Sequence, residues 1–232
     1  MFRFYSEIQS PEEWRKQLAD PQKNWDEGKS AYELTYAWLS VNGALPASVN
    51  KLLDSCEIFK NLTVEKAIVE KKVEIDTYGR PSQTDIMLYG YNKNGKIVIA
   101  VEGKESEPFD LPVSKWLKTM REGSNKKPRL NKLRTTLGLD KLGNDKLEKI
   151  SYQLLHRTVS ALLEAREYNA QYTMMLVHSF LDDDIKDHFE DYSYFLGLMG
   201  IENSSIRRNK IVGPVLLNNI NLYFGWLRDK KK

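Results

Sequence analysis

The hydrophobic and polar positions change their period along the chain, and the changes mark the expected elements. Between Thr84 and Lys104 two runs alternate with the period of two typical of strands, and Asn-Lys-Asn-Gly joins them, so this stretch is predicted as an antiparallel hairpin. The alternation and β-branched residues of 71–75 indicate a strand before it. The apolar run at 171–180 predicts a buried strand, and the tail from Asn209 predicts two more strands at a sheet edge.

Apolar residues at helical spacing predict helices between these strands. A short helix should follow Ser10, and the others are expected at 30–39, 46–60, 113–122, 128–137, 147–169 and 185–198, the last of them capped by the acidic run 182–184. Ser30 is expected to cap its helix, with Glu33 as the third residue of a capping box. In the helix at 147–169, Gln153 and Arg157 share a polar face beside the apolar stripe.

The element order is helix, three strands, helix and strand, which indicates an α/β protein. A chain of 232 residues fits one domain spanning 1–232. Within it we expect N-terminal helices at 1–60, a core at 62–180 and a C-terminal extension at 181–232.

Composition narrows the class of protein. Hydrophobic residues make up 41% and charged residues 29% of the chain, as is ordinary for a soluble globular protein. No apolar run approaches the roughly 20 residues that span a bilayer, so membrane insertion is not expected. The N-terminus lacks the layout of a signal peptide, and the single cysteine, Cys56, suits a reducing compartment. We therefore expect a cytoplasmic protein.

The basic residues are concentrated in one segment, although the net charge of the chain is only +3. Residues 115–149 contain 11 Lys or Arg and 4 Asp or Glu, and they include Lys126, Lys127 and Arg129. Lys and Arg that neutralise phosphates supply most of the sequence-independent affinity for nucleic acid. The alternative is a solvated helical surface.

The hairpin carries the candidate chemistry. A four-residue loop at 92–95 would place Asp85 opposite Glu102. A two-residue turn at Asn94-Gly95 would place Asp85 opposite Lys104 instead, and a three-residue loop would separate these side chains. Two carboxylates that face each other are destabilising unless something offsets the repulsion. A hard divalent cation does so, and Mg²⁺ typically takes one or two carboxylates together with water and phosphate.

These residues also resemble a known signature. Pro81-Ser-Gln-Thr-Asp85, sixteen intervening residues and then Glu102-Gly103-Lys104 resemble the motif of the PD-(D/E)XK nuclease superfamily, although Pro81 stands four positions before the aspartate. The chain looks like small bacterial members of unassigned function that share Arg-Pro-Ser-Gln-x-Asp, Val-Glu-Gly-Lys and Tyr-Gln-Leu-Leu-His-Arg segments. The resemblance implies a restriction-endonuclease-like core, with a mixed β-sheet flanked by helices in α-β-β-β-α-β order.

The resemblance and the basic segment together predict a Mg²⁺-dependent (or Mn²⁺-dependent) nuclease acting on DNA, with RNA as the second choice. Asp85, Glu102 and the Gly103 carbonyl would bind the metal, and Lys104 would position the attacking water. The helix after the hairpin would present Gln153 to the site, with Arg157 behind it. Substrate binding would fall to Gln83, Arg157, Lys126, Lys127 and Arg129.

Several alternatives stay open. The scaffold would also serve a protein that binds nucleic acid or a partner without turnover, and the acids and Lys104 would also form a structural salt-bridge cluster. Gln83 would equally stabilise a turn, and the face with Gln153 and Arg157 would also suit solvent. Additional ligands are conceivable at Glu33, Glu70, Glu74 and Asp76, for which capping or solvation is the simpler interpretation. A homodimer would match the two strands of a duplex.

Overall fold

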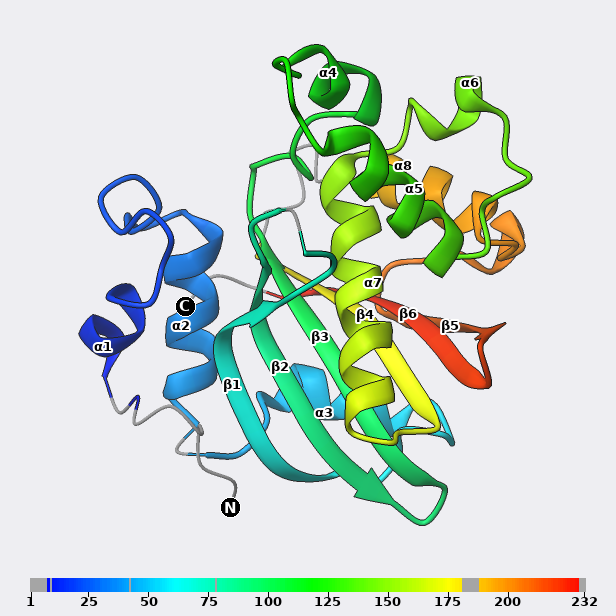
Figure 1. The fold of residues 1–232 in the computed structure, drawn as a ribbon. Coiled ribbons are helices and arrows are strands. Elements are labelled where there is room, and N and C mark those ends of the chain that lie inside the picture. The colour runs from blue at the N-terminus through cyan, green and yellow to red at the C-terminus, as the bar shows by residue number, and fades with distance from the viewer. Residues whose placement is uncertain (1–7, 9, 42, 78, 181–187, 230–232) are drawn as a thin grey trace.

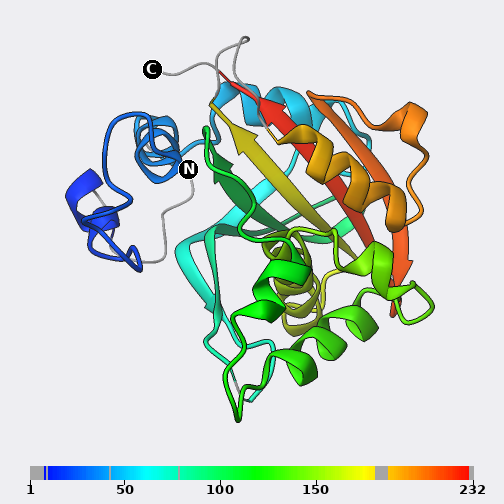
Figure 2. The same ribbon diagram turned by 90° about the horizontal axis from the view of Figure 1, so that it is seen from above.

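The chain folds around one six-stranded sheet with helices on both faces, as Figures 1 and 2 show. The computed structural model describes residue 8 and residues 10–41, 43–77, 79–180 and 188–229. The helices are α1 (Pro11–Arg15), α2 (Ser30–Leu39), α3 (Ala47–Asp54), α4 (Val113–Lys118), α5 (Lys126–Thr136), α6 (Asn144–Leu147), α7 (Tyr152–Glu167) and α8 (Phe189–Leu198), with a 3-10 turn, η1 (Asn203–Ser205). The strands are β1 (Thr63–Val73), β2 (Ser82–Asn92), β3 (Gly95–Lys104), β4 (Tyr172–Ser179), β5 (Lys210–Leu217) and β6 (Ile220–Arg228).

The sheet is mixed, with the strand order β1-β2-β3-β4-β6-β5. The first three strands form an antiparallel meander, β3, β4 and β6 are parallel, and β5 returns antiparallel to β6. The parallel step from β3 to β4 requires a crossover, which α7 supplies. The α/β class and the mixed, helix-flanked sheet are therefore confirmed.

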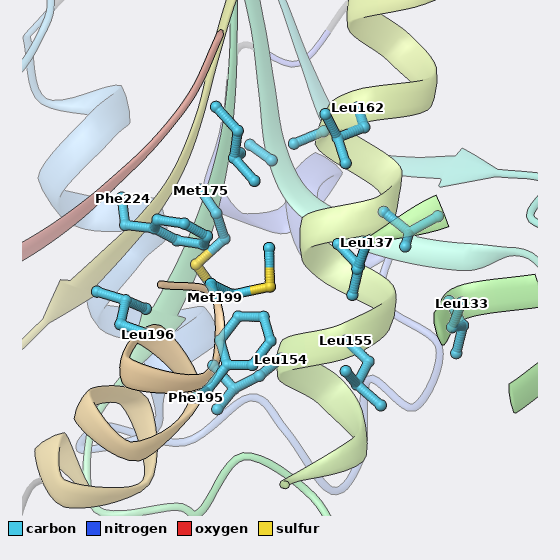
Figure 3. Packing of buried hydrophobic residues seen from close by; sticks show 14 of the residues in the cluster. Leu133, Leu137, Leu154, Leu155, Leu162, Met175, Phe195, Leu196, Met199 and Phe224 are labelled. Atoms are coloured by element: carbon cyan, nitrogen blue, oxygen red, sulfur yellow. The ribbon is translucent and has the colours of Figure 1, made fainter. Parts of the chain in front are cut away.

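Each face of the sheet buries its own apolar cluster. Trp14, Trp38 and Leu53 from the N-terminal helices pack on one face. On the other face, α7 packs against β4 and β6, α5 packs against α7, and Phe195 of α8 packs against Phe224 of β6 (Figure 3). A fully buried side chain of this kind contributes about 1.5–3 kcal/mol, so the two clusters hold the strand ends in fixed positions.

The hairpin has the register that brings the two carboxylates together. Asn92 pairs with Gly95, so the turn is shorter than the four-residue loop, but the register is the one that the longer loop predicts. Asp85 therefore occupies the cross-strand position of Glu102, one step beyond the last regular pair.

Several predicted boundaries were wrong, each for a reason visible in the fold. The helix at 147–169 begins at Tyr152, because the backbone of Ser151 forms an isolated bridge with Pro112. Ser30 is the first residue of α2 rather than its cap, and its backbone N–H donates to Glu107 instead. Glu33 still serves the helix start, since it accepts the N–H of Gly28 at 3.0 Å.

The remaining differences lie at the two ends of the sheet. The first strand starts at Thr63, well before the alternating segment, because it pairs with β2 along its length. Of the two C-terminal strands, β5 lies at the edge as predicted, whereas β6 lies between β4 and β5. The acidic run 182–184 and the predicted start of its helix at 185–187 fall outside the described residues. In the described part of the chain, no helix combines the length and apolarity that a bilayer crossing needs.

Candidate active site

The carboxylates of three neighbouring strands converge where those strands meet the N-terminal helices and α7. The pairing of β1 with β2 places Glu70 and Asp85 at the same cross-strand position, and the register of β2 with β3 adds Glu102. All three line one pocket of about 590 Å³ together with Lys104 and Gln153. The structure thus brings together all four predicted catalytic residues.

Glu102 is buried and its carboxylate is held by cations. Its Oε1 accepts hydrogen bonds from Lys104 Nζ at 3.1 Å and from Gln153 Nε2 at 2.6 Å, and its Oε2 accepts from Arg157 Nε at 2.5 Å. Burial alone would raise the pKa of Glu102, but Arg157 and Lys104 outweigh burial and lower that pKa below its ordinary value. Glu102 is therefore the ionised member of the group.

Asp85 lacks such a counter-ion. Its Oδ2 accepts the backbone N–H of Gly103 at 2.7 Å, which ties the ends of the two strands together. Burial raises the pKa of Asp85 well above its ordinary range, and the charges of Glu102 and Glu70 raise it further. The carboxyl group of Asp85 is consequently poised to hold a proton, or to exchange that proton for a cation.

Glu70 was predicted as a surface acid, and that interpretation was wrong. A positive φ of 50° lets it leave the regular strand pattern. Its carboxylate accepts hydrogen bonds from Gln83 Nε2 at 2.9 Å and Trp14 Nε1 at 3.3 Å. Burial raises the pKa of Glu70 to about 7, and the charge of Glu102 adds to the rise.

The pocket has an excess of carboxylates at its centre. Glu70, Asp85 and Glu102 gather around two cations, Lys104 and Arg157, and both cations bind Glu102. Among the residues that the structure describes, no three His, Cys, Asp or Glu side chains are grouped so that they alone could hold a metal ion. A metal would need other oxygen donors as well.

One such donor is present. Gln153 donates its amide N–H to Glu102, while its Oε1 is buried without a hydrogen-bond partner among the described residues. A buried acceptor of this kind costs about 1–3 kcal/mol. Together with the carboxylates of Asp85 and Glu102 it forms an all-oxygen donor set, which is the set that Mg²⁺ and Mn²⁺ prefer. These three side chains fit a hard divalent cation.

Arg157 also orders the side chains on the far side of Glu102. Its Nη1 donates to Ser82 Oγ at 2.9 Å, and Ser82 Oγ lies 2.8 Å from Nδ1 of His156. Ser82 Oγ has two acceptor positions and one proton, so it links Arg157 to His156 in either tautomer of the ring. Burial lowers the pKa of His156 well below its ordinary value, and the charge of Arg157 lowers it further, so the ring is neutral.

The other predicted residues lie around this centre in different ways. Lys126 and Arg129 line a neighbouring pocket, whereas Lys127 is exposed and lines neither pocket. Gln83 borders both pockets and binds Glu70 and the Gln17 carbonyl rather than stabilising a turn.

The alternatives for the remaining acids and for the helix face are also decided. Arg157 and Glu164 are buried and paired, so a solvated helix face was the wrong alternative. Asp76 pairs with Arg129 at 3.0 Å instead of facing solvent, while Glu74 is exposed. For Gly103 the structure shows the N–H contact to Asp85, and the metal-binding role of its carbonyl stays a prediction.

Sequence reasoning missed Ser82 and His156. His156 lies three residues after Gln153, on the same helix face, and that signal was available. Ser82 precedes Asp85 by three residues in the motif segment. Glu70 was named as a conceivable additional ligand but interpreted as a surface acid, and no local pattern marks its positive φ inside β1.

Comparison with protein families gives one match. A family model described as a domain of unknown function, DUF6946, matches residues 7–231. Neither the search of curated proteins nor the search of solved structures found a match.

Proposed function

Because the chain belongs to the DUF6946 family, whose description gives no activity, we propose its function from the pocket itself. We propose a Mg²⁺- or Mn²⁺-dependent nuclease that hydrolyses phosphodiester bonds of DNA, with RNA as the second substrate. The observation that carries the proposal is the convergence of Asp85, Glu102, Lys104 and Gln153 in one pocket, with an excess of carboxylate there and an unpartnered amide oxygen. Groups with perturbed pKa values in a cleft are typical of functional sites.

Each residue has a role that follows from its contacts. Asp85, Glu102 and Gln153 Oε1 would hold the cation, which when bound supplies positive charge against a phosphate and lowers the pKa of a water. Lys104 Nζ fixes Glu102 at 3.1 Å and has further protons to donate to the attacking water or to a phosphate oxygen. Arg157 keeps Glu102 ionised and in place.

The sheet supports the finer fold assignment, a restriction-endonuclease-like core. An antiparallel meander carries the acids, and β3 then passes through α7 to the parallel strand β4. This arrangement agrees with the α-β-β-β-α-β order that the resemblance to PD-(D/E)XK nucleases implies. In α/β sheets, ligands bind beyond the carboxyl ends of the parallel strands, where Glu102 and Lys104 lie.

The test is a cleavage assay with plasmid DNA, single-stranded DNA and RNA, in Mg²⁺, Mn²⁺ or EDTA. Wild type should cut at least one substrate only with metal, and Asp85→Asn and Lys104→Met should not cut it. Lys132→Ala, a change at an exposed position outside both pockets, is the control for contaminating nuclease and should match wild type. Equal cleavage by all four proteins, or no cleavage under any condition, would contradict the proposal.

A second candidate is a nucleic-acid- or partner-binding protein on a nuclease-like scaffold, without turnover. It is favoured by one observation, that Lys104, Gln153 and Arg157 already occupy both oxygens of Glu102. A metal that binds the folded protein must raise its melting temperature. Salt-sensitive DNA binding with no such rise in Mg²⁺ or Mn²⁺ would select this candidate over the enzyme.

A further inference from the structure

A second pocket opens directly beside the carboxylates. It has a volume of about 470 Å³ and shares Gln83, His156 and Arg157 with the first pocket. The two pockets therefore form neighbouring parts of one groove, with Arg157 and His156 at their boundary.

The two parts differ in charge. The first pocket is lined by both signs: five acids, Glu70, Asp85, Glu102, Glu107 and Asp110, and four cations, Lys23, Lys29, Lys104 and Arg157. Four cations, Arg80, Lys126, Arg129 and Arg157, line the second, and no Asp or Glu does so among the described residues. A hollow lined by cations alone attracts an anion.

Two of the four cations are not neutralised. Arg129 pairs with Asp76, and Arg157 pairs with Glu102. Lys126 Nζ contacts the Trp116 carbonyl and the Thr119 hydroxyl, which carry no charge. The Arg80 guanidinium has no ion-pair partner in the part of the chain that the structure describes.

Neutral donors add to this surface. His156 Nε2 has no hydrogen-bond partner among the described residues, because the hydrogen bond of its ring to Ser82 is made through Nδ1. Trp116 stacks on Tyr152 with ring centroids 4.0 Å apart, and Lys126 Nζ lies 4.7 Å from the Trp116 ring. The aromatic rings are thus engaged with protein and offer no open platform for a base.

We propose that this second pocket is a phosphate subsite, which binds a phosphodiester of the substrate strand next to the one at the carboxylates. Arg80 and Lys126 supply the charge, and His156 supplies a neutral hydrogen bond in the tautomer that carries its proton on Nε2. The inference rests on the proposed function, and it adds that the substrate is a chain with at least two phosphates, held through its backbone without regard to base sequence.

Binding in EDTA tests the subsite without requiring cleavage. Labelled single-stranded oligonucleotides of different length and sequence are titrated by fluorescence anisotropy at several salt concentrations. Arg80→Gln with Lys126→Gln should weaken binding about tenfold and reduce the slope of log K against log salt by about 0.7 for each phosphate that the protein no longer neutralises. Lys132→Gln with Lys141→Gln makes the same charge change on exposed residues outside both pockets and should have a much smaller effect.

A small diester separates the subsite from catalysis. Bis(p-nitrophenyl) phosphate has one phosphate, so its metal-dependent hydrolysis should be lost in Asp85→Asn, should fall far less than oligonucleotide affinity in Arg80→Gln with Lys126→Gln, and should be unchanged in Lys132→Gln with Lys141→Gln. Loss of oligonucleotide affinity without any hydrolysis by wild type would retain the subsite and reject the nuclease. Equal losses from the two double variants, or no oligonucleotide binding by wild type, would overturn the subsite, and circular dichroism confirms that each variant is folded.

Discussion

Two groups of polar side chains are buried at the carboxyl ends of neighbouring parallel strands, and they differ in how fully their hydrogen bonds are satisfied. Gly103 of β3 pairs with His178 of β4, so the groups lie side by side. Around His178, Trp38 Nε1 donates to Nδ1 at 3.2 Å, and Nε2 donates to Asp229 at the same distance. Ser48 also donates to Asp229. Each ring nitrogen thus has one complementary partner.

The protonation of His178 follows from these contacts. Because Trp38 donates to Nδ1, the ring is neutral and carries its proton on Nε2. Burial lowers the pKa of His178, although Asp229 opposes that effect. Nothing in this group calls for a ligand.

The carboxylate pocket is arranged differently. Gln153 Oε1 is buried and lacks a hydrogen-bond partner among the described residues, and the pKa values of Asp85 and Glu70 are raised by burial beside other carboxylates. A satisfied network rigidifies a fold, whereas an incompletely satisfied one costs stability unless a ligand completes it. The carboxylate pocket is thus the less completely satisfied of the two groups, and the following substitutions test that difference.

The largest contrast is expected at Asp85. Asp85→Asn keeps an oxygen for the Gly103 N–H but removes a proposed metal ligand, so metal-dependent cleavage should fall by about 10³-fold or more. It also removes the cost of burying a carboxyl group that is ionised in the unfolded chain. The melting temperature should rise by a few degrees, as about 1 kcal/mol corresponds to roughly 2–4 °C in a domain of this size. His178→Ala is the matched change and should lower the melting temperature with cleavage retained. Cleavage by Asp85→Asn, or a lowered melting temperature, would remove the distinction between the two groups.

Arg157 should be the most important stabilising residue of the pocket. Arg157→Met leaves the buried carboxylate of Glu102 without its main counter-charge and should cost about 3–5 kcal/mol in the free energy of unfolding. Glu102→Gln added to that variant should recover part of the loss, since the buried carboxylate is then neutral and only Lys104 is left without its ion-pair partner. Urea denaturation measures the free energy of unfolding of the single and the double variant. Additive effects of the two substitutions would contradict an interaction between Arg157 and Glu102.

Glu70 should make the protein less stable as the pH rises. Its pKa is about 7 in the folded chain against an ordinary 4.5, so the folded state binds more protons between these values. Stability should therefore fall by about 3 kcal/mol as the pH rises from 4.5 to 7 and then level off. Glu70→Gln should flatten this dependence. Mg²⁺ should raise the melting temperature more at pH 8 than at pH 5, because metal ligands bind in their ionised form. If the pH dependence of stability is unchanged in Glu70→Gln, then groups other than Glu70 cause it.

The smallest effect is expected at Trp38. Trp38→Phe keeps the ring in the core but leaves His178 Nδ1 without a donor, which should cost about 1–2 kcal/mol. Cleavage should be unaffected, because this group does not line the carboxylate pocket. Loss of cleavage in a folded Trp38→Phe protein would show that the two groups act together.

The sequence was sufficient where the chemistry is local. The alternation of the hairpin and its turn residues predicted β2 and β3, and the register that puts Asp85 beside Glu102 was one of three that they allowed. The helical spacing placed Gln153 and Arg157 on one face. Patterns of this kind depend on residues within a few positions of each other, so a single sequence is enough to recognise them.

The sequence was insufficient where contacts between residues far apart in the chain determine the position of a side chain or the start of a helix. Glu70 reaches the pocket through a positive φ inside β1, and charge and alternation alone made it look like a surface acid. Likewise, the start of α7 is set by the bridge between Ser151 and Pro112, residues far apart in the sequence. Lys126 and Lys127 are adjacent basic residues, yet only Lys126 lines a pocket, because helix α5 packs in one orientation.

The crossover through α7 has a consequence for the order of synthesis. Glu102 is made 51 residues before Gln153 and 55 residues before Arg157. A growing chain that has emerged only as far as β3 thus carries Glu102 without the amide and guanidinium that hold it. We expect the pocket to assemble only once α7 has docked, so the proposed activity would belong to the folded domain and not to the nascent polypeptide.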